Sequence, residues 1–213
     1  QSRSSAASDV YKRQAVNTEN FNFDPDQLRD KYRQERDKRL RADGNDQYKE
    51  VEGDFKYFVE DPYTEKVKKN SENLITEVAI IGGGFGGILA ASRLRMSGID
   101  DFKIIEKGGD FGGTWYWNRY PGASCDIESY IYFPLLEETK FVPKHKYTNA
   151  PETLEYIGKI SEKFNLAENA IFQTEVTEVI WLEKDGLWKI STNNGDDISC
   201  LLYTSDAADD LLC

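Results

Sequence analysis

A cluster of glycines between an apolar run and a helix-forming segment constrains this chain most. From Thr76 the sequence reads TEVAIIGGGFGGILAASRLRMSG. Gly82, Gly84 and Gly87 have the spacing of a dinucleotide-binding turn, where the first glycine allows a tight turn, the second a close approach to a pyrophosphate and the third helix packing on the strand. The N-terminus of the helix would face the phosphates with unpaired N–H groups. The sequence therefore predicts a strand–turn–helix unit that binds a dinucleotide.

A second apolar run, DFKIIEK, contains an acidic residue, Glu106. It follows Gly82 at about the separation, roughly 20 residues, at which a carboxylate accepts hydrogen bonds from a ribose hydroxyl. Because a carboxylate repels a 2′-phosphate, it favours FAD or NAD over NADP at this position. The alternative is a β-α-β unit whose glycines serve packing alone.

Charge and composition exclude several classes of protein. The chain has 213 residues and a formal net charge of −11, which argues against nucleic-acid binding because phosphate contacts need clustered Lys and Arg. No apolar run approaches the roughly 20 residues of a membrane span, and no secretory signal is present. We therefore expect an acidic, cytoplasmic protein of one or two domains that binds neither nucleic acid nor membrane.

The two ends are related at the level of DNA. Residues 4–14 read SSAASDVYKRQ and residues 200–210 read CLLYTSDAADD; with suitable codons, the opposite strand of the first, shifted by one base, translates as the second. This resembles the translated transposon-end adapter of a sequencing library. We therefore predict that residues 1–14 and 200–213 are non-native tails and exclude them from fold reasoning. Cys125 is then the one native cysteine, which suits a reducing compartment.

Residues 15–74 form a charged N-terminal extension. A helix is predicted from about Asp26 to Arg41, ending before Gly44 and Asn45. We interpret this extension as a solvated arm that lies over a larger domain; a basic surface for a charged partner is the alternative.

An aromatic loop, GGTWYWNRYPGASCD, runs from Gly112 to Asp126. It follows the second predicted strand and so passes the carboxyl ends of the strands, where ligands bind in open α/β sheets. Trp115 and Trp117 offer flat walls, and the glycine pair allows backbone N–H groups to approach a ligand. The loop is typical of a lining for a large planar cofactor. The alternative is a small aromatic core with Asp126 as a surface or capping residue.

Together these motifs resemble the FAD domain of the type I Baeyer–Villiger monooxygenases, whose motif GGxWxxxxYPGxxxD is matched from Gly112 to Asp126. The resemblance implies a Rossmann-like α/β fold, a parallel sheet with a β-meander, over a partial FAD-binding domain at residues 75–199, truncated relative to the family. It also implies a set of cofactor-binding residues: Gly82, Gly84, Phe85, Gly87, Glu106, Gly113, Thr114, Trp115, Asp126, Tyr132 and Val176. Asp126 would in addition be catalytic, as the partner of an Arg that lies downstream of this chain.

The family resemblance further implies a function. The whole protein would be an FAD- and NADPH-dependent monooxygenase that inserts one oxygen atom from O2 next to a ketone carbonyl, giving an ester or lactone. The NADP domain would lie outside this chain, so that the fragment alone would be inactive. A related flavin monooxygenase acting on nitrogen or sulfur, and a non-catalytic nucleotide-binding scaffold, are the alternatives.

The remaining sequence predicts a helix and a hairpin. A helix is expected over residues 151–164 with Leu154, Ile157, Ile160 and Phe164 on its packed face. A hairpin over residues 176–192 would turn at Asp185 and Gly186, and truncation at Ser199 would leave an exposed strand edge. His145, the one histidine, is expected at the surface, so that neither a His-based triad nor a multi-histidine metal site is available.

Overall fold

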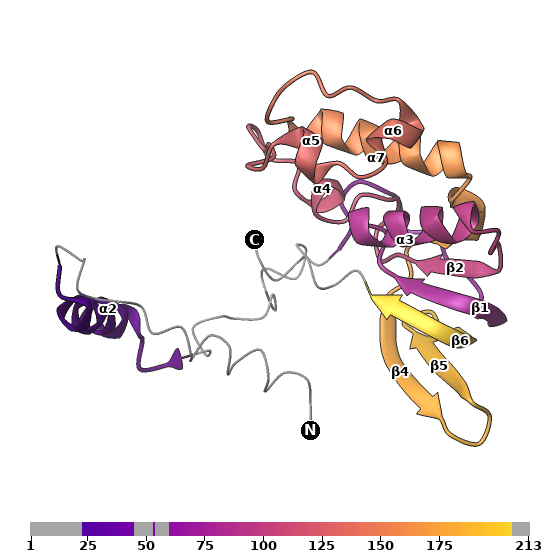
Figure 1. Ribbon diagram of the computed structural model, residues 1–213. Coiled ribbons are helices and arrows are strands. Elements are labelled where there is room, and N and C mark those ends of the chain that lie inside the picture. Colours follow the sequence, from indigo (N-terminus) through magenta and orange to yellow (C-terminus); the bar gives the residue numbers. More distant parts are fainter. Residues whose placement is uncertain (1–22, 45–52, 54–59, 206–213) are drawn as a thin grey trace. The chain divides into compact units, whose positions relative to one another are not determined.

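The computed structural model describes residues 23–44, 53 and 60–205 (Figure 1). The chain divides into two compact units, residues 1–59 and residues 60–213. The predicted tail at residues 1–14, most of residues 45–59 and the end of the chain from residue 206 lie outside the described residues.

The first unit contains one described helix, α2 (Pro25–Arg39). The Asp24 side chain caps it by accepting hydrogen bonds from the backbone N–H groups of Asp26 and Gln27, at 2.9 and 3.3 Å. Pro25 occupies the first turn, where a missing N–H costs nothing. The helix predicted over residues 26–41 is therefore confirmed within two residues at its end, and no α2 residue is buried.

The second unit contains a six-stranded mixed sheet. Its order is β3 (Ala170–Ile171), β2 (Phe102–Ile105), β1 (Asn73–Ile81), β6 (Asp197–Ser205), β5 (Leu187–Thr192) and β4 (Val176–Leu182). The first four strands in this order are parallel, and β6, β5 and β4 are joined antiparallel as a meander. This arrangement confirms the predicted Rossmann-like α/β class with its β-meander, including the hairpin formed by β4 and β5.

The end of the sheet differs from the prediction. We expected the fold to stop at Ser199 and to leave an open edge, but β6 continues to Ser205 and pairs with β1 along its whole length, up to Ile81 opposite Ser205. That expectation is wrong, because ladder hydrogen bonds depend on the backbone and tolerate many side chains. The side chains of Leu201 and Leu202 are nevertheless about 60% exposed, at 61% and 59%. The origin of residues 200–213 as a tail stays a prediction.

The start of the second unit also differs. The domain was expected from residue 75, whereas β1 begins at Asn73 and the unit begins at Glu60. Residues 60–72, assigned to the arm on sequence grounds, therefore belong to the unit that contains the sheet.

Apolar side chains cover both faces of the sheet. One face carries α3 (Phe85–Met96), α7 (Ala150–Phe164) and the short helices α4 (Thr114–Trp117), α5 (Ser129–Tyr132) and α6 (Leu136–Thr139) (Figure 1). Val78 and Ile80 of β1 point into this larger core, while Ala79 points into the smaller core of the opposite face. The alternation follows from the two-residue period of a strand.

Helix α7 begins one residue before the predicted helix and ends at the predicted residue. Asn149 caps it through the backbone N–H of Glu152 at 3.0 Å, and Pro151 lies in the first turn. Ile157 and Ile160 are fully buried in the larger core, where Leu154 and Phe164 pack against it. The predicted packing role of this face is confirmed.

Candidate functional site at the carboxyl ends of the parallel strands

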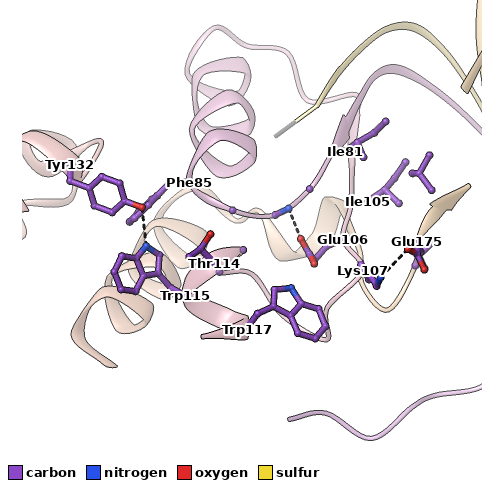
Figure 2. Close-up of a pocket in the computed structure, with 17 residues that line it drawn as sticks. Ile81, Phe85, Ile105, Glu106, Lys107, Thr114, Trp115, Trp117, Tyr132 and Glu175 are labelled. Atoms are coloured by element: carbon purple, nitrogen blue, oxygen red, sulfur yellow. Dashed lines mark hydrogen bonds and ion pairs between the residues drawn. The ribbon is translucent and has the colours of Figure 1, made fainter. Parts of the chain in front are cut away.

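A pocket of about 360 Å³ opens where β1 and β2 end (Figure 2). Ile81 and Ile105, the last residues of these strands, are part of its lining. This is the edge of an open α/β sheet at which ligands bind. The rest of the lining consists of Gly82, Gly83, Gly84 and Phe85 after β1; Glu106, Lys107, Gly112, Gly113, Thr114, Trp115 and Trp117 after β2; Tyr132 of α5; and Thr174, Glu175 and Val176 at the start of β4.

The glycine turn has the geometry that its spacing predicts. Gly82 has φ +102°, which side chains disfavour, and its N–H donates to the Ile105 carbonyl at 2.8 Å. A Cβ on Gly87 would stand 2.0 Å from the Gly82 carbonyl oxygen, so this glycine lets α3 pack on the turn. Gly84 is the N-cap of α3 and supplies no side-chain cap. The first-turn N–H groups of α3 consequently face the pocket side without a side-chain acceptor at the cap.

The carboxylate of Glu106 is fixed in the pocket wall. Its side chain is buried, with 5% exposure, and its two oxygens accept hydrogen bonds from the backbone N–H groups of Gly83 at 2.5 Å and Gly108 at 2.6 Å. A carboxylate oxygen can accept more than one hydrogen bond, and the hydroxyls of a ribose are suitable donors. The two backbone hydrogen bonds hold the acidic residue in one orientation before any ligand arrives.

The aromatic loop reaches the pocket through its glycines. The Gly112 N–H donates to the Gly83 carbonyl at 2.9 Å, and a Cβ on Gly113 would lie 2.8 Å from the Cα of Gly84. Gly113 has φ +52°, in the left-handed region. A side chain at residue 113 would push the aromatic loop away from the glycine turn, so glycine at this position allows the two segments to pack directly against each other.

Three aromatic side chains close one end of the pocket (Figure 2). The indole N–H of Trp115 donates to the hydroxyl of Tyr132 at 3.0 Å, and the rings of Phe85 and Tyr132 meet edge to face with centroids 5.2 Å apart. Trp117 adds a further flat wall. These contacts give this end rigid apolar surfaces suited to a planar ring system.

The opposite end of the pocket is polar and includes residues that sequence reasoning missed. Lys107 and Glu175 form an ion pair with Nζ 2.9 Å from Oε1, beside the predicted residue Val176 (Figure 2). Thr174 also lines this end. The only available signal was that these residues adjoin Glu106 and Val176 in sequence, since the pair itself joins residues far apart in the chain.

Two predicted site residues do not line the pocket. Gly87 serves the packing of α3, as described above. Asp126 is exposed and is absent from the pocket wall. The N-cap of α5 is Glu128 rather than Asp126, and no side chain caps this helix. The alternative in which Asp126 caps this helix is therefore wrong. Asp126 instead lies at the surface, as the other alternative predicted.

The groups outside the pocket that could carry chemistry include a cysteine and the histidine. Burial raises the pKa of the Cys125 thiol, aided by the charge of Asp126, so that the protonated form is favoured. His145 is exposed, as predicted. Within the described ranges, His, Cys, Asp and Glu side chains form no group of three that could hold a metal ion. No helix in those ranges has the length and apolar character needed to cross a membrane.

Comparisons with known proteins agree with this geometry. A family model described as an NAD(P)-binding Rossmann-like domain matches residues 80–142. A Baeyer–Villiger monooxygenase of Stachybotrys chlorohalonatus is 45% identical over 190 residues, covering 88% of this chain and 30% of that protein. Pentalenolactone D synthase of Streptomyces exfoliatus is 46% identical over 170 residues, covering 79% of this chain and 29% of the synthase.

Solved structures are similar as well. The polycyclic ketone monooxygenase of Thermothelomyces thermophila superposes with a TM-score of 0.74 at 33% identity, covering 85% of this chain and 32% of its own. A structure of the monooxygenase OTEMO in complex with FAD and NADP has a TM-score of 0.59 at 31% identity, covering 62% of this chain and 26% of the OTEMO chain. Over most of its length the chain is homologous to Baeyer–Villiger monooxygenases, and it spans about 30% of the length of these curated relatives.

Proposed function

We propose that this chain is the FAD-binding part of a Baeyer–Villiger monooxygenase that oxygenates a ketone with O2 and NADPH. One observation carries the proposal: the glycine turn, the buried Glu106 carboxylate and the aromatic loop form a single pocket at the strand ends. The complex of a similar monooxygenase with FAD and NADP supports the choice of cofactors. The ketone substrate, the second nucleotide and a cytoplasmic location belong to the proposal for the whole protein.

The two ends of the pocket suit the two halves of FAD. Glu106 would accept hydrogen bonds from the adenosine ribose, and the first turn of α3 would face the pyrophosphate. The backbone of Val176 would meet the adenine. Gly113, Thr114, Trp115 and Tyr132 would line the ribityl and ring half, with Phe85 behind Tyr132. When bound, FAD supplies the redox chemistry with O2, while the protein binds and orients it.

The residues of this chain would act by position and by excluding water. The Trp115–Tyr132 hydrogen bond holds two aromatic walls in a fixed relation, which restricts how a ring system can lie between them. Asp126 stays our proposed catalytic residue: its exposed carboxylate is available to orient an Arg supplied by another part of the whole protein. This role is separate from FAD binding because Asp126 does not line the pocket.

Titration of the purified chain with FAD, followed by flavin fluorescence, tests the cofactor site. We expect Glu106→Gln to weaken FAD binding about tenfold or more, because an amide cannot accept with both ends and leaves an N–H of the wall unpaired. NADPH should bind the unmodified chain more weakly than FAD, since the carboxylate repels a 2′-phosphate.

The matched control is Glu137→Gln in α6. Glu137 is exposed and makes no hydrogen bond or ion pair among the described residues, so this change removes the same charge without touching the pocket. Equal FAD affinity of the two variants, with both melting like the unmodified chain, would rule out the proposed role of Glu106. Absence of FAD binding by the unmodified chain would instead favour the non-catalytic scaffold.

A further inference from the structure

Residues 61–69 run across the second unit next to the pocket, and we call this segment the strap. At its first end, the Oδ2 of Asp61 accepts hydrogen bonds from the Gly109 N–H at 2.9 Å and from the Tyr116 hydroxyl at 2.5 Å. Because the single Tyr116 proton points to the carboxylate, the Thr64 hydroxyl donates to the Tyr116 oxygen at 2.8 Å. The strap is thereby fixed to the loop that carries Gly112, Gly113 and Thr114.

The packing at this first end is close. A Cβ on Gly109 would stand 2.4 Å from the Cβ of Thr64, so the loop accepts the strap there only because residue 109 is glycine. The Tyr63 hydroxyl donates to the Trp117 carbonyl at 3.1 Å, and the Arg119 guanidinium lies 3.9 Å from the centre of the Tyr63 ring. Side chains of the strap thus contact Gly109 and, in the aromatic loop, Trp117 and Arg119.

The second end of the strap holds the other loop of the pocket. The side-chain amide of Gln173 accepts from the Val67 N–H at 2.9 Å and donates to the Glu65 carbonyl at 2.8 Å. Lys69 donates to the Phe172 carbonyl at 2.5 Å. Residues 174–176, which line the polar end of the pocket, follow directly.

The backbone of Gln173 is itself constrained. Its φ of +52° lies in the left-handed region, which costs free energy for a residue with a side chain and persists where the surroundings hold it. Its N–H donates to the Gly108 carbonyl at 2.8 Å, and the Thr174 N–H donates to the Glu106 carbonyl at 2.9 Å. The two loops therefore meet behind Glu106, and the strap contacts both.

We propose that the strap is a positioning element that holds the two pocket-lining loops at a fixed separation and so pre-organises the site for its dinucleotide. Its positioning contacts are made by Asp61 of the strap and by Gln173 of the second loop. Neither side chain lines the pocket, so Asp61 acts through the loop that it contacts and Gln173 through the loop to which it belongs. The effect on the dinucleotide rests on the proposed function, whereas the effect on the loops does not.

The electrostatics of Asp61 agree with a structural anchor. Burial by itself would raise its pKa, but hydrogen bonds from the Tyr116 hydroxyl and from the backbone N–H groups of Tyr63, Gly109 and Thr64 outweigh burial and lower the pKa. Burial, together with the hydrogen bond to Asp61, raises the pKa of Tyr116. The carboxylate stays ionised and the phenol protonated over the neutral range, which is the pairing that the hydrogen bond requires.

Amide hydrogen exchange of the isotope-labelled chain, followed by NMR, tests the strap without any ligand. The informative amides are those of Gly112, which donates to the Gly83 carbonyl of the glycine turn, and of Thr174, which donates to the Glu106 carbonyl, because neither is bonded to the strap. We expect about tenfold faster exchange of Gly112 in Asp61→Asn and of Thr174 in Gln173→Ala, as local opening becomes easier. Amides of the central strand β1 should be unchanged, which separates positioning from a general loss of stability.

The matched control is Glu65→Gln, which removes a carboxylate from the same strap. The Glu65 side chain is exposed and makes no hydrogen bond or ion pair in the described part of the chain. Exchange at Gly112 and Thr174 that is as slow in the first two variants as in the control overturns the proposal, as does an equal acceleration throughout β1. Tyr116→Phe, which keeps the ring and removes the hydroxyl, should reproduce the Asp61→Asn effect at Gly112.

FAD titration of the same variants tests the consequence for the pocket. We expect Asp61→Asn and Gln173→Ala each to weaken FAD binding about tenfold, because loops that must be ordered on binding reduce affinity. Unchanged affinity beside faster exchange would overturn pre-organisation of the site. If the unmodified chain binds no FAD, the proposed function fails, and the exchange measurement alone decides whether the strap holds the loops.

Discussion

Helices α2 and α7 have the same length and the same local signals, yet they stand in opposite environments. Each has 15 residues, an Asp or Asn as N-cap and a proline in its first turn. Helix α2 buries no residue, whereas α7 buries seven, among them Ile157 and Ile160. The comparison shows that capping and proline placement decide where a helix begins, while its contribution to the fold depends on the surface that it packs against.

The largest difference is expected from truncating an apolar side chain in each helix. Ile160→Ala should lower the free energy of unfolding of the second unit by about 2–5 kcal/mol, because it leaves a cavity in the larger core. Leu28→Ala in α2 should change it by less than about 0.5 kcal/mol, since Leu28 is 40% exposed and no α2 residue is buried. Urea unfolding followed by tryptophan fluorescence measures both. Similar effects of the two changes would show that the helices do not differ in the way described.

Removing the caps should give an intermediate effect that appears in different measurements. Asn149→Ala is expected to cost about 1 kcal/mol and to lower the unfolding midpoint of the second unit, because α7 is part of its core. Asp24→Ala removes a comparable cap but should reduce only the helicity of residues 25–39, seen in NMR chemical shifts. If Asp24→Ala also lowered the unfolding midpoint of the second unit, the expected difference between the two caps would be contradicted.

The smallest effect is expected from salt. Exposed ion pairs at i,i+3 spacing join Arg29 to Asp26, Arg33 to Asp30 and Lys38 to Glu35 along α2. Each such pair contributes about 0.2–0.5 kcal/mol and is screened by salt, so 1 M NaCl should lower the helicity of α2. Helix α7 should respond little, because its buried face stabilises it. NMR chemical shifts of residues in both helices, followed through one salt titration, measure the change in helicity.

Features whose signals lie close together in the sequence were predicted, whereas contacts between residues far apart in the chain were not. The strand–turn–helix unit, both helices and the β4–β5 hairpin were found because their signals lie within a few residues of one another. The glycine turn and the aromatic loop were likewise placed at the pocket. By contrast, Lys107 and Glu175 form their ion pair across a long stretch of chain, and no local pattern indicates it. Asp126 was expected beside the cofactor but lies exposed, outside the pocket wall.

The sequence by itself determined the local elements, because backbone preferences, caps and the two periodicities of apolar residues act over a few positions. It also determined the chemistry of the pocket wall, since the glycines and the acidic residue must stand at set distances along the chain. Only the tertiary structure decided that residues 200–205 complete a central strand and that Asp61 and Gln173 hold the two loops. The physical reason is that pairing between distant segments depends on backbone groups common to nearly all residues, and on distances that exist only after the chain has folded.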